Sequence, residues 1–200
     1  MMKKGENFNR PKAGSMTRVE PIRNLKDIET IKKLLTDNPR NLCLFTLGIN
    51  TNLRASDLLG IRVQQVRGLK PMDEITLMEK KTGNHRRINL NKSCIDAINR
   101  LLASRAYHDD DDEYLFIGQR GRLTVPYLNY MVKTWCRAIN LKGNYGSHTL
   151  RKTWGYIQRT HFGHSLPELT EVFGHSTQRQ TLTYLCIQPE EIKKIYANEI

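Results

Sequence analysis

Residues 146 to 156, GSHTLRKTWGY, concentrate basic side chains at a predicted helix start. Ser147 is a residue type that serves as an N-cap, and apolar residues follow at helical spacing. His148, Arg151 and Lys152 occupy the first turns, where the partial positive charge of a helix N-terminus disfavours cations. An anionic ligand in front of the helix would reverse that effect. The alternative is a solvated face on a basic protein.

This predicted helix has two faces at a rotation of about 100° per residue. The side expected to face the core carries Leu150, Trp154, Ile157 and His161. The three basic residues lie within about 100° of one another on another side, together with Gly155. A glycine at that position lets another backbone approach closely.

The overall charge also favours an anionic partner. The 200 residues carry a net charge of +12 and are 38% hydrophobic, which is typical of a globular chain. An excess this large in a small protein indicates a polyanion partner, and nucleic acid is the commonest one. Plain solubility is the alternative explanation.

The cysteines and the hydropathy pattern exclude several classes of protein. The four cysteines form no CxxC pair, which argues against a zinc cluster and favours reduced, buried thiols. The chain has no run of eighteen apolar residues and no signal-peptide core at its start. We therefore expect a soluble cytoplasmic protein with no membrane partner.

Helical periodicity begins at Asn24 and predicts a mainly α-helical α+β fold. Helices are expected after Asn24, after Asn38–Pro39, after Asn91, from Thr124, at His148, and after the capping box SLPE at 165–168. The last of these ends at Gly174, and one more helix holds Tyr184. The segments DEITLMEK and HRRINLN, separated by KTGN, predict a β-hairpin. VQQVRGLK at 63–70 is the candidate third strand of a small three-stranded antiparallel sheet.

Two terminal segments flank the predicted domain of residues 24–188. Residues 1–23 are polar and basic, and we expect either a flexible basic arm or a leader segment. Residues 189–200 predict a short amphipathic tail with Ile192, Ile195 and Tyr196 on one side. That tail either docks onto a neighbouring molecule or folds back on its own core.

Five motifs carry a family resemblance. In chain order they are Arg54 in NLRASDLL, Lys81 in KTGN, HTLR at 148–151, Gly174–His175, and Tyr184 in TLTYL. The set resembles the tyrosine recombinase (phage integrase) family, whose catalytic domain carries Arg, Lys, His-x-x-Arg, His or Trp, and Tyr in this order. The step of nine residues from His175 to Tyr184 is also similar to the family's. The resemblance covers about residues 24 to 188 and implies the catalytic-domain fold.

The resemblance implies six catalytic residues, Arg54, Lys81, His148, Arg151, His175 and Tyr184. Cleavage of a phosphodiester adds negative charge to the non-bridging oxygens, and one preorganised donor is typically worth about 3 kcal/mol. Arg54 and Arg151 offer planar forks that suit a phosphate, so we expect both to bind DNA, with Lys152 reaching a nearby phosphate. With these cations no metal ion or other cofactor is needed, and no carboxylate cluster suited to two magnesium ions is present.

Proton transfers can be assigned to the remaining residues. Tyr184 would attack phosphorus, and because a free tyrosine has a pKa near 10, His148 is the candidate base. Lys81 is the candidate acid for the leaving alkoxide, with adjacent Lys80 as an alternative. His175 would hydrogen-bond the phosphate or hold Tyr184.

The sequence departs from the family's pattern in three ways. Full-length members carry a further helical domain before the catalytic one, whereas here only the basic segment precedes it. That leaves open the DNA affinity of this chain alone and whether it is a fragment of a longer protein. Asn52 stands where the family often has glycine. Asp57 stands where glutamate is common, and we expect it to orient active-site groups.

These features predict a site-specific DNA recombinase of the integrase or invertase type that works through a 3′-phosphotyrosine. The resemblance implies double-stranded DNA as partner, a homotetramer on two sites, accessory DNA-bending proteins, and a prokaryotic or phage-encoded, nucleoid-associated enzyme. A DNA-binding regulator that no longer cuts is one alternative, which the complete set of six residues disfavours. A type IB topoisomerase is another, which the small size and the His175 to Tyr184 spacing disfavour.

Overall fold

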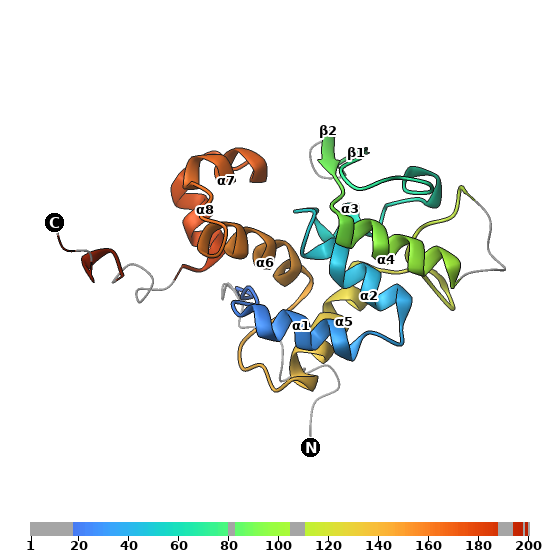
Figure 1. Ribbon diagram of the computed structural model, residues 1–200, viewed down its shortest axis with the longest axis horizontal. Coiled ribbons are helices and arrows are strands. Elements are labelled where there is room, and N and C mark those ends of the chain that lie inside the picture. The colour runs from blue at the N-terminus through green and yellow to red at the C-terminus, as the bar shows by residue number, and fades with distance from the viewer. Residues whose placement is uncertain (1–17, 80–82, 105–110, 188–193, 198, 200) are drawn as a thin grey trace, which may run out of the picture.

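The structure is a computed structural model that describes residues 18–79, 83–104, 111–187, 194–197 and 199. These residues form a mainly helical α+β fold, as predicted, with two small antiparallel sheets (Figure 1). The helices are α1 (Leu25–Leu34), α2 (Pro39–Gly48), α3 (Ala55–Leu58), α4 (Lys92–Ala103), α5 (Val125–Ala138), α6 (Ser147–Thr160), α7 (Leu166–Phe173) and α8 (Gln178–Leu185). Two 3-10 helices are η1 (Val63–Gln65) and η2 (Lys194–Ala197), and the strands are β1 (Glu74–Met78), β2 (His85–Asn89), β3 (Ile117–Gly118) and β4 (Gly121–Arg122).

Most helices begin at the predicted capping residues. In five helices the side-chain oxygen of the N-cap residue accepts a backbone N–H of the helix. These N-caps are Asn24 for α1, Asn38 for α2, Asn91 for α4, Thr124 for α5 and Ser165 for α7. Glu168 completes the predicted capping box at α7, because its carboxylate accepts the Ser165 N–H at 2.7 Å. Gly174 ends α7 in the left-handed conformation, with φ 65°.

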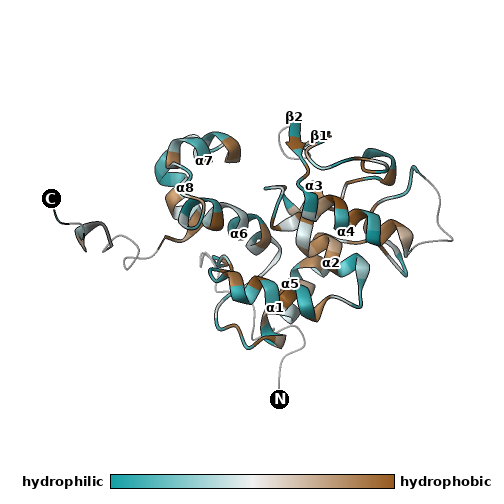
Figure 2. Cartoon of the chain, in the orientation of Figure 1, coloured by the Kyte–Doolittle hydropathy of each residue, from teal (hydrophilic) through white to brown (hydrophobic). Residues whose placement is uncertain are grey.

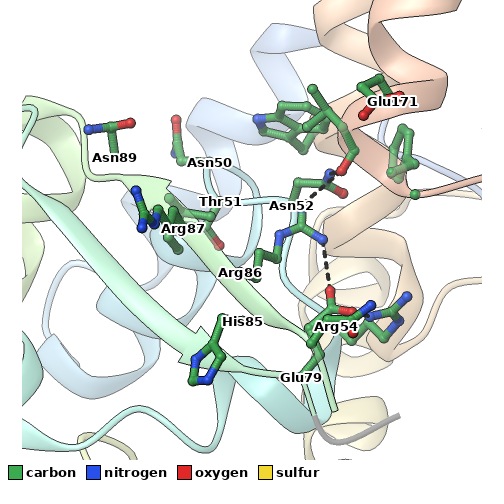
Figure 3. A pocket seen from close by; sticks show the side chains of 16 residues that line it. Asn50, Thr51, Asn52, Arg54, Glu79, His85, Arg86, Arg87, Asn89 and Glu171 are labelled. Carbon is green, nitrogen blue, oxygen red and sulfur yellow. Dashed lines mark hydrogen bonds and ion pairs between the residues drawn. The ribbon is translucent and has the colours of Figure 1, made fainter. Parts of the chain in front are cut away.

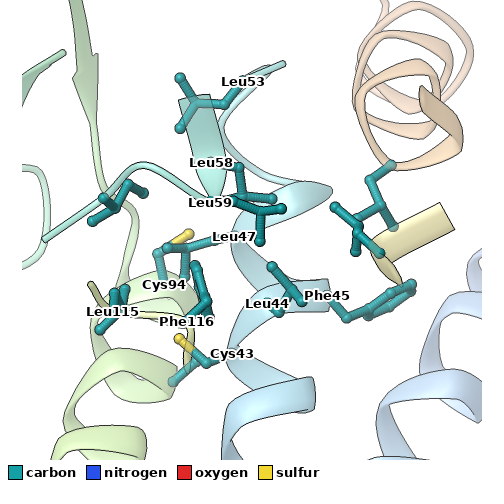
Figure 4. Packing of buried hydrophobic residues seen from close by; sticks show 14 of the residues in the cluster. Cys43, Leu44, Phe45, Leu47, Leu53, Leu58, Leu59, Cys94, Leu115 and Phe116 are labelled. Carbon is teal, nitrogen blue, oxygen red and sulfur yellow. The ribbon is translucent and has the colours of Figure 1, made fainter. Parts of the chain in front are cut away.

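One large hydrophobic cluster fills the space between α1 to α5, the hairpin and the first turn of α6. Figure 4 shows Cys43, Leu47, Cys94 and Phe116 within it, and all four are buried. Figure 2 shows hydrophobic and hydrophilic residues in turn along the helices, which is the pattern of helices that bury one face. Burial raises the pKa of the Cys94 thiol to about 12 and keeps it protonated at neutral pH.

The predicted hairpin is present, but the predicted third strand is not. Strand β1 pairs antiparallel with β2 in the register Ile75 to Ile88. Residues 63–65, expected in a third strand, form η1 instead. The N–H of Arg62, the N-cap of η1, donates to the Gln65 side-chain oxygen at 2.8 Å. That local cap supports a turn of 3-10 helix, so the hairpin sheet has two strands in the described part of the chain.

The basic arm was predicted to reach residue 23, and the structure shortens it. Ile22 is fully buried, and its N–H donates to Thr153 Oγ1 at 2.8 Å. The Glu20 N–H donates to the Asn144 carbonyl at 2.7 Å. Because the Ile22 side chain is buried and the N–H groups of Glu20 and Ile22 are hydrogen-bonded to distant residues, residues 18–23 pack as part of the folded domain. Residues 1–17 lie outside the described residues.

A second, smaller cluster lies at the C-terminal end of the domain. Leu169, Phe173 and Leu185 form it between α6, α7 and α8, and Figure 1 shows α7 and α8 gathered at one end of the molecule. Beyond α8, the described residues of the tail are η2 and residue 199, and Tyr196 in η2 is 86% exposed. Ile192 of the predicted tail lies outside the described residues. No helix in the described ranges is long and apolar enough to cross a membrane.

Candidate active site

Helix α6 begins one residue earlier than the capping pattern predicts. Gly146, not Ser147, is the N-cap. The Gly146 N–H donates to Thr149 Oγ1 at 3.0 Å, and the Ser147 N–H donates to Asn129 Oδ1 at 3.0 Å. A Cβ at position 146 would overlap Asn129 Oδ1, so a larger residue there would displace the Asn129 amide from the Ser147 N–H. The Asn129 side chain, from α5, therefore caps the first helical N–H in place of the predicted cap.

The basic residues of α6 do not share one solvated face. His148 is exposed in the first turn, whereas Arg151 and Lys152 are only 4% and 5% exposed. On the opposite side Leu150 is buried as predicted. His161, expected in the core, is exposed, because α6 ends there and its ring stacks edge-on against Phe162.

Arg151 connects α6 to the end of α7. Its Nη2 donates to the Phe173 carbonyl at 3.0 Å, and its guanidinium lies 5.3 Å from the centroid of the Phe173 ring. Burial lowers the pKa of Arg151 to about 10, so the side chain stays charged at neutral pH. Its buried Nη1 has no hydrogen-bond partner among the described residues.

Lys152 lies on the other side of α6, turned away from solvent. Its Nζ donates to the Val19 carbonyl at 2.9 Å and to Cys186 Sγ at 3.3 Å. A phosphate contact was predicted for this side chain. The structure does not support that role, because the ammonium is buried and already bonded.

Arg54 stands at the N-cap of α3 and faces a carboxylate from the hairpin. Arg54 Nη1 lies 2.5 Å from Glu79 Oε2, and Arg86 Nη1 lies 3.1 Å from Glu79 Oε1. Arg86 Nη2 also donates to the Val172 carbonyl at 3.0 Å, and Asn52 Nδ2 donates to the same oxygen at 3.1 Å. Glu79 therefore joins two arginines, and Arg86 joins the hairpin to α7.

His175 follows Gly174 and is oriented by two threonines. Its Nδ1 lies 2.9 Å from Thr181 Oγ1, which in turn lies 3.0 Å from Thr170 Oγ1. The imidazole stacks on the Phe173 ring at 5.0 Å, nearly parallel. The pKa of His175 lies below its ordinary value, mainly because of burial and then because of the Arg151 and Arg54 charges. The ring is therefore neutral at neutral pH.

Tyr184 lies in the second half of α8 with its ring among aromatic neighbours. The ring meets those of Phe173 and His175 at centroid distances of 5.2 Å each. Its hydroxyl is buried and has no hydrogen-bond partner in the described part of the chain. Burial raises the pKa of Tyr184 to about 12, although the positive charges of Arg151 and Arg54 oppose the shift. The phenol is thus held neutral beside two cations.

A cavity of about 670 Å³ separates the hairpin from α7 (Figure 3). Figure 3 shows that Arg54, Glu79 and Arg86 line one end of it, while Asn50 and Asn89 line the other. Its wall also includes Gly174, the residue before His175. The cavity is polar and carries more basic than acidic side chains, which suits an anionic ligand.

Of the six predicted catalytic residues, the structure brings four together. Arg54, Arg151, His175 and Tyr184 are close enough to influence one another's ionisation. His148 is placed on the first turn of α6 and is exposed. Lys81 and the alternative Lys80 lie outside the described residues, so their predicted role stays a prediction.

The remaining predicted residue, Asp57, lies in the first turn of α3. It is 4% exposed, and Ser56 Oγ donates to its Oδ1 at 3.1 Å. Its predicted role, orienting active-site groups, stays a prediction.

Glu79 and Arg86 are site residues that the sequence analysis missed. Alternation along the first strand could have identified Glu79, since Ile75, Leu77 and Glu79 share the buried face. A carboxylate on the inner face of a strand needs a cationic partner, and Arg54 and Arg86 provide two.

The family is shown by comparison with known proteins. The family model described as "Phage integrase family" matches residues 23–191. This chain belongs to that family. It is 31% identical over 182 residues to the "Probable integrase/recombinase YoeC" of Bacillus subtilis (strain 168), covering 89% of this chain and 95% of that protein. It is also 31% identical over 176 residues to a "Tyrosine recombinase XerC" of Caldanaerobacter subterraneus, covering 84% of this chain and 48% of that protein.

Solved structures show the tyrosine recombinase catalytic-domain fold. The XerA recombinase superposes with a TM-score of 0.73 at 17% identity, covering 89% of this chain and 65% of that one. XerH bound to its palindromic difH substrate superposes with a TM-score of 0.74 at 20% identity, covering 92% and 54%. This phage integrase family chain thus spans nearly all of YoeC but about half of the XerC relative and of XerH.

Proposed function

We propose that this protein is a site-specific recombinase that cleaves and rejoins DNA strands through a covalent bond to Tyr184. The observation that carries the proposal is the convergence of Arg54, Arg151, His175 and Tyr184 from four separate segments. The buried Arg151 Nη1 and the Tyr184 hydroxyl have no hydrogen-bond partner among the described residues. A phosphate oxygen between them would accept from both.

The chemistry follows from the residue types. Arg54 and Arg151 hold the non-bridging oxygens, where negative charge grows as phosphorus becomes pentacoordinate. The Tyr184 oxygen forms a bond to phosphorus, the bond from phosphorus to the 5′ oxygen breaks, and a 3′-phosphotyrosine results. His148 takes the phenol proton and Lys81 gives a proton to the departing 5′ oxygen. No metal ion is required, because the arginines supply the positive charge.

Two features of the site set requirements for this reaction. Arg54 is paired with Glu79, so a phosphate has to compete with that carboxylate or share the guanidinium with it. His175 presents Nε2 as its remaining ring nitrogen, because Nδ1 is engaged by Thr181. We assign His175 to hydrogen-bond either the phosphate or the tyrosine oxygen.

The partner and the assembly belong to the same proposal. Exchange of strands requires two duplexes, and we propose four copies of the chain on two sites, as in the lambda integrase tetramer bound to a Holliday junction. Phosphate contacts would dominate binding to double-stranded DNA, so affinity should fall steeply with salt. Accessory DNA-bending proteins and a prokaryotic, cytoplasmic setting complete the proposal.

A trapping experiment with randomised DNA tests the proposal, because the protein itself then selects its target site. The protein is incubated with a pool of nicked duplexes of randomised sequence, and adducts that resist denaturation are isolated and sequenced. Mass spectrometry should find the nucleotide on the peptide that contains Tyr184. Tyr184→Phe should form no adduct, whereas Tyr196→Phe, which alters an exposed tyrosine of the tail, should behave as the parent.

Each outcome is informative. An adduct that persists in Tyr184→Phe means that another residue is the nucleophile. Tight binding to enriched sequences with no adduct from any variant would support the alternative of a DNA-binding regulator.

A further inference from the structure

Lys152 is a buried cation next to the proposed nucleophile. It is 5% exposed, and its Nζ donates to the Val19 carbonyl and to Cys186 Sγ. No carboxylate lies within ion-pair distance of Lys152 in the described parts of the chain. An ammonium that leaves water without a counter-ion loses much of its hydration energy. A charged residue at this position therefore calls for a reason other than stability.

The third neighbour of the ammonium supplies that reason. Lys152 Nζ lies 4.9 Å from the centroid of the Tyr184 ring, within the range of a cation–π contact. Such a contact strengthens when the site is desolvated, as it is here. It strengthens further when the ring acquires negative charge, which happens as Tyr184 loses its proton.

We propose that Lys152 is a positioning residue that holds the Tyr184 ring and stabilises the negative charge that develops on this phenol during cleavage and religation. This inference rests on the proposed function, since it requires Tyr184 to be the nucleophile. The same charge develops in both directions, because the phenol oxygen attacks in cleavage and leaves in religation. Lys152 acts through the ring and not through the phosphate.

The other charged groups around Tyr184 do not make Lys152 redundant. Arg151 from α6 and Arg54 from the start of α3 face the phenol, and His175 faces it from the α7–α8 connection. In the proposed reaction both arginines are bound to the phosphate, which offsets their positive charge. Cys186 lies just beyond α8 and contributes no cation. Lys152 is then the cation beside the ring that no phosphate oxygen engages.

Lys152 also fixes where the ring stands. Its bonds to Val19 and Cys186 connect the N-terminal segment to the residue that ends α8. Arg23 makes a second link, from Nη2 to the Cys186 carbonyl at 3.1 Å. The end of the nucleophile helix is thereby tied to a segment that packs against the large core.

The test separates charge stabilisation from DNA binding and from simple packing. Lys152→Met keeps the length of the side chain and removes the charge, and Lys152→Gln keeps a donor for the Val19 carbonyl. At saturating nicked DNA we expect both variants to form the Tyr184 adduct about 10- to 100-fold more slowly. DNA affinity and its salt dependence should match the parent. Lys26→Met removes an equal charge from an exposed site on α1 and should cleave at the parental rate.

A rescue experiment excludes a purely structural role. Placing 3,5-difluorotyrosine at position 184 makes the phenol more acidic, so it should restore much of the rate lost in Lys152→Met. A packing defect would not respond to phenol acidity. Weaker binding with a smaller salt slope and normal cleavage at saturation would overturn the inference in favour of a phosphate contact. Parental cleavage in both variants would also overturn it, whereas absence of a Tyr184 adduct in the parent refutes the proposed function itself.

Discussion

The two hydrophobic clusters of this domain differ in size and in what they hold. The large cluster spans α1 to α5 and the hairpin, and it supports Arg54 at the start of α3. The small cluster consists of Leu169, Phe173 and Leu185, and it supports His175 and Tyr184. Local stability follows the amount of buried apolar contact, so the small cluster should open first. Arg54 thus rests on the firm region, and the proposed nucleophile rests on the weaker one.

Helix α6 and a few polar contacts join the two regions. The first turn of α6 packs into the large cluster through Leu150, while Trp154, one turn later, packs against the small one. Three side-chain donors from the large region, on Asn52, Arg86 and Arg151, reach the last carbonyls of α7. Cations at a helix C-terminus are also favoured by the helix dipole. The position of the proposed nucleophile therefore depends on contacts that can be removed one at a time.

The largest effect on formation of the Tyr184 adduct should come from Gly155→Ala. A methyl group at this position would clash with the Phe173 ring and the Leu185 side chain, so α7 and α8 could not seat on α6. Alanine is favoured over glycine in a helix by about 1 kcal/mol, but overpacking costs about 1–3 kcal/mol. Misplacement of Tyr184 should reduce adduct formation about 100-fold or more.

The two tryptophans make the comparison measurable. Trp135 reports on the large cluster and Trp154 on the small one, and the chain has only these two. In urea, Gly155→Ala should shift the Trp154 fluorescence transition and leave that of Trp135 nearly unchanged. Gly48→Ala, which crowds Leu150 inside the large region, should shift both transitions. If both variants moved both transitions equally, the two regions would unfold as one.

A smaller effect on formation of the Tyr184 adduct should come from Arg86→Ala. The change removes a cation from Glu79 and a side-chain donor from the Val172 carbonyl at the end of α7. We expect adduct formation to fall about 30-fold, equivalent to about 2 kcal/mol. Hydrogen exchange of the α7 amides should accelerate. Arg137→Ala provides the control, because Arg137 is an exposed arginine in the last turn of α5 and does not line the cavity between the hairpin and α7.

The sequence predicted the elements whose signals are local. Five helices begin where an N-cap side chain bonds an N–H of its own helix, so the signal lies within a few residues. These N-caps are Asn24, Asn38, Asn91, Thr124 and Ser165. The start of α6 was displaced by one residue because Asn129, from a different helix, holds the Ser147 N–H. The absent third strand has a different, local origin, because the Gln65 side chain accepts the Arg62 N–H and closes a 3-10 turn there.

The sequence also predicted which residues meet, but not how each is used. Arg151, His175 and Tyr184 come together as the motif order implies. Periodicity alone could not show that Lys152 turns into the protein, because that depends on Val19 and Cys186 from distant parts of the chain. Gly155 was expected to admit another backbone, and it admits the Phe173 and Leu185 side chains.

Thr181→Val should produce an effect of about 3- to 10-fold on cleavage. Thr181 is fully buried and bonds His175 Nδ1, so the valine leaves that nitrogen without its partner and the imidazole free to rotate. The large cluster should be unaffected, which the Trp135 transition checks. Thr183→Val lies on the exposed side of the same helix and serves as the matched control. Equal rates for the two variants would mean that His175 is held by its stacking on Phe173 alone.

The smallest effect should come from His175→Gln and concerns the loss of stability at acid pH. It involves a titratable side chain that rests on the small cluster. The pKa of His175 lies below its ordinary value, chiefly because of burial and then because of Arg151 and Arg54. The unfolded chain therefore binds this proton at a higher pH than the folded chain does, and stability must fall as the pH drops below about 6.5. His175→Gln should lose less stability than the parent between pH 7.5 and 5.5, as followed by the Trp154 transition. Bound DNA should reduce the difference, since a phosphate beside the ring raises the pKa of His175 again. If the free energy of unfolding had the same pH dependence in the parent and in His175→Gln, His175 would be as solvated in the folded chain as in the unfolded one. The small cluster would then not shield this side chain from water.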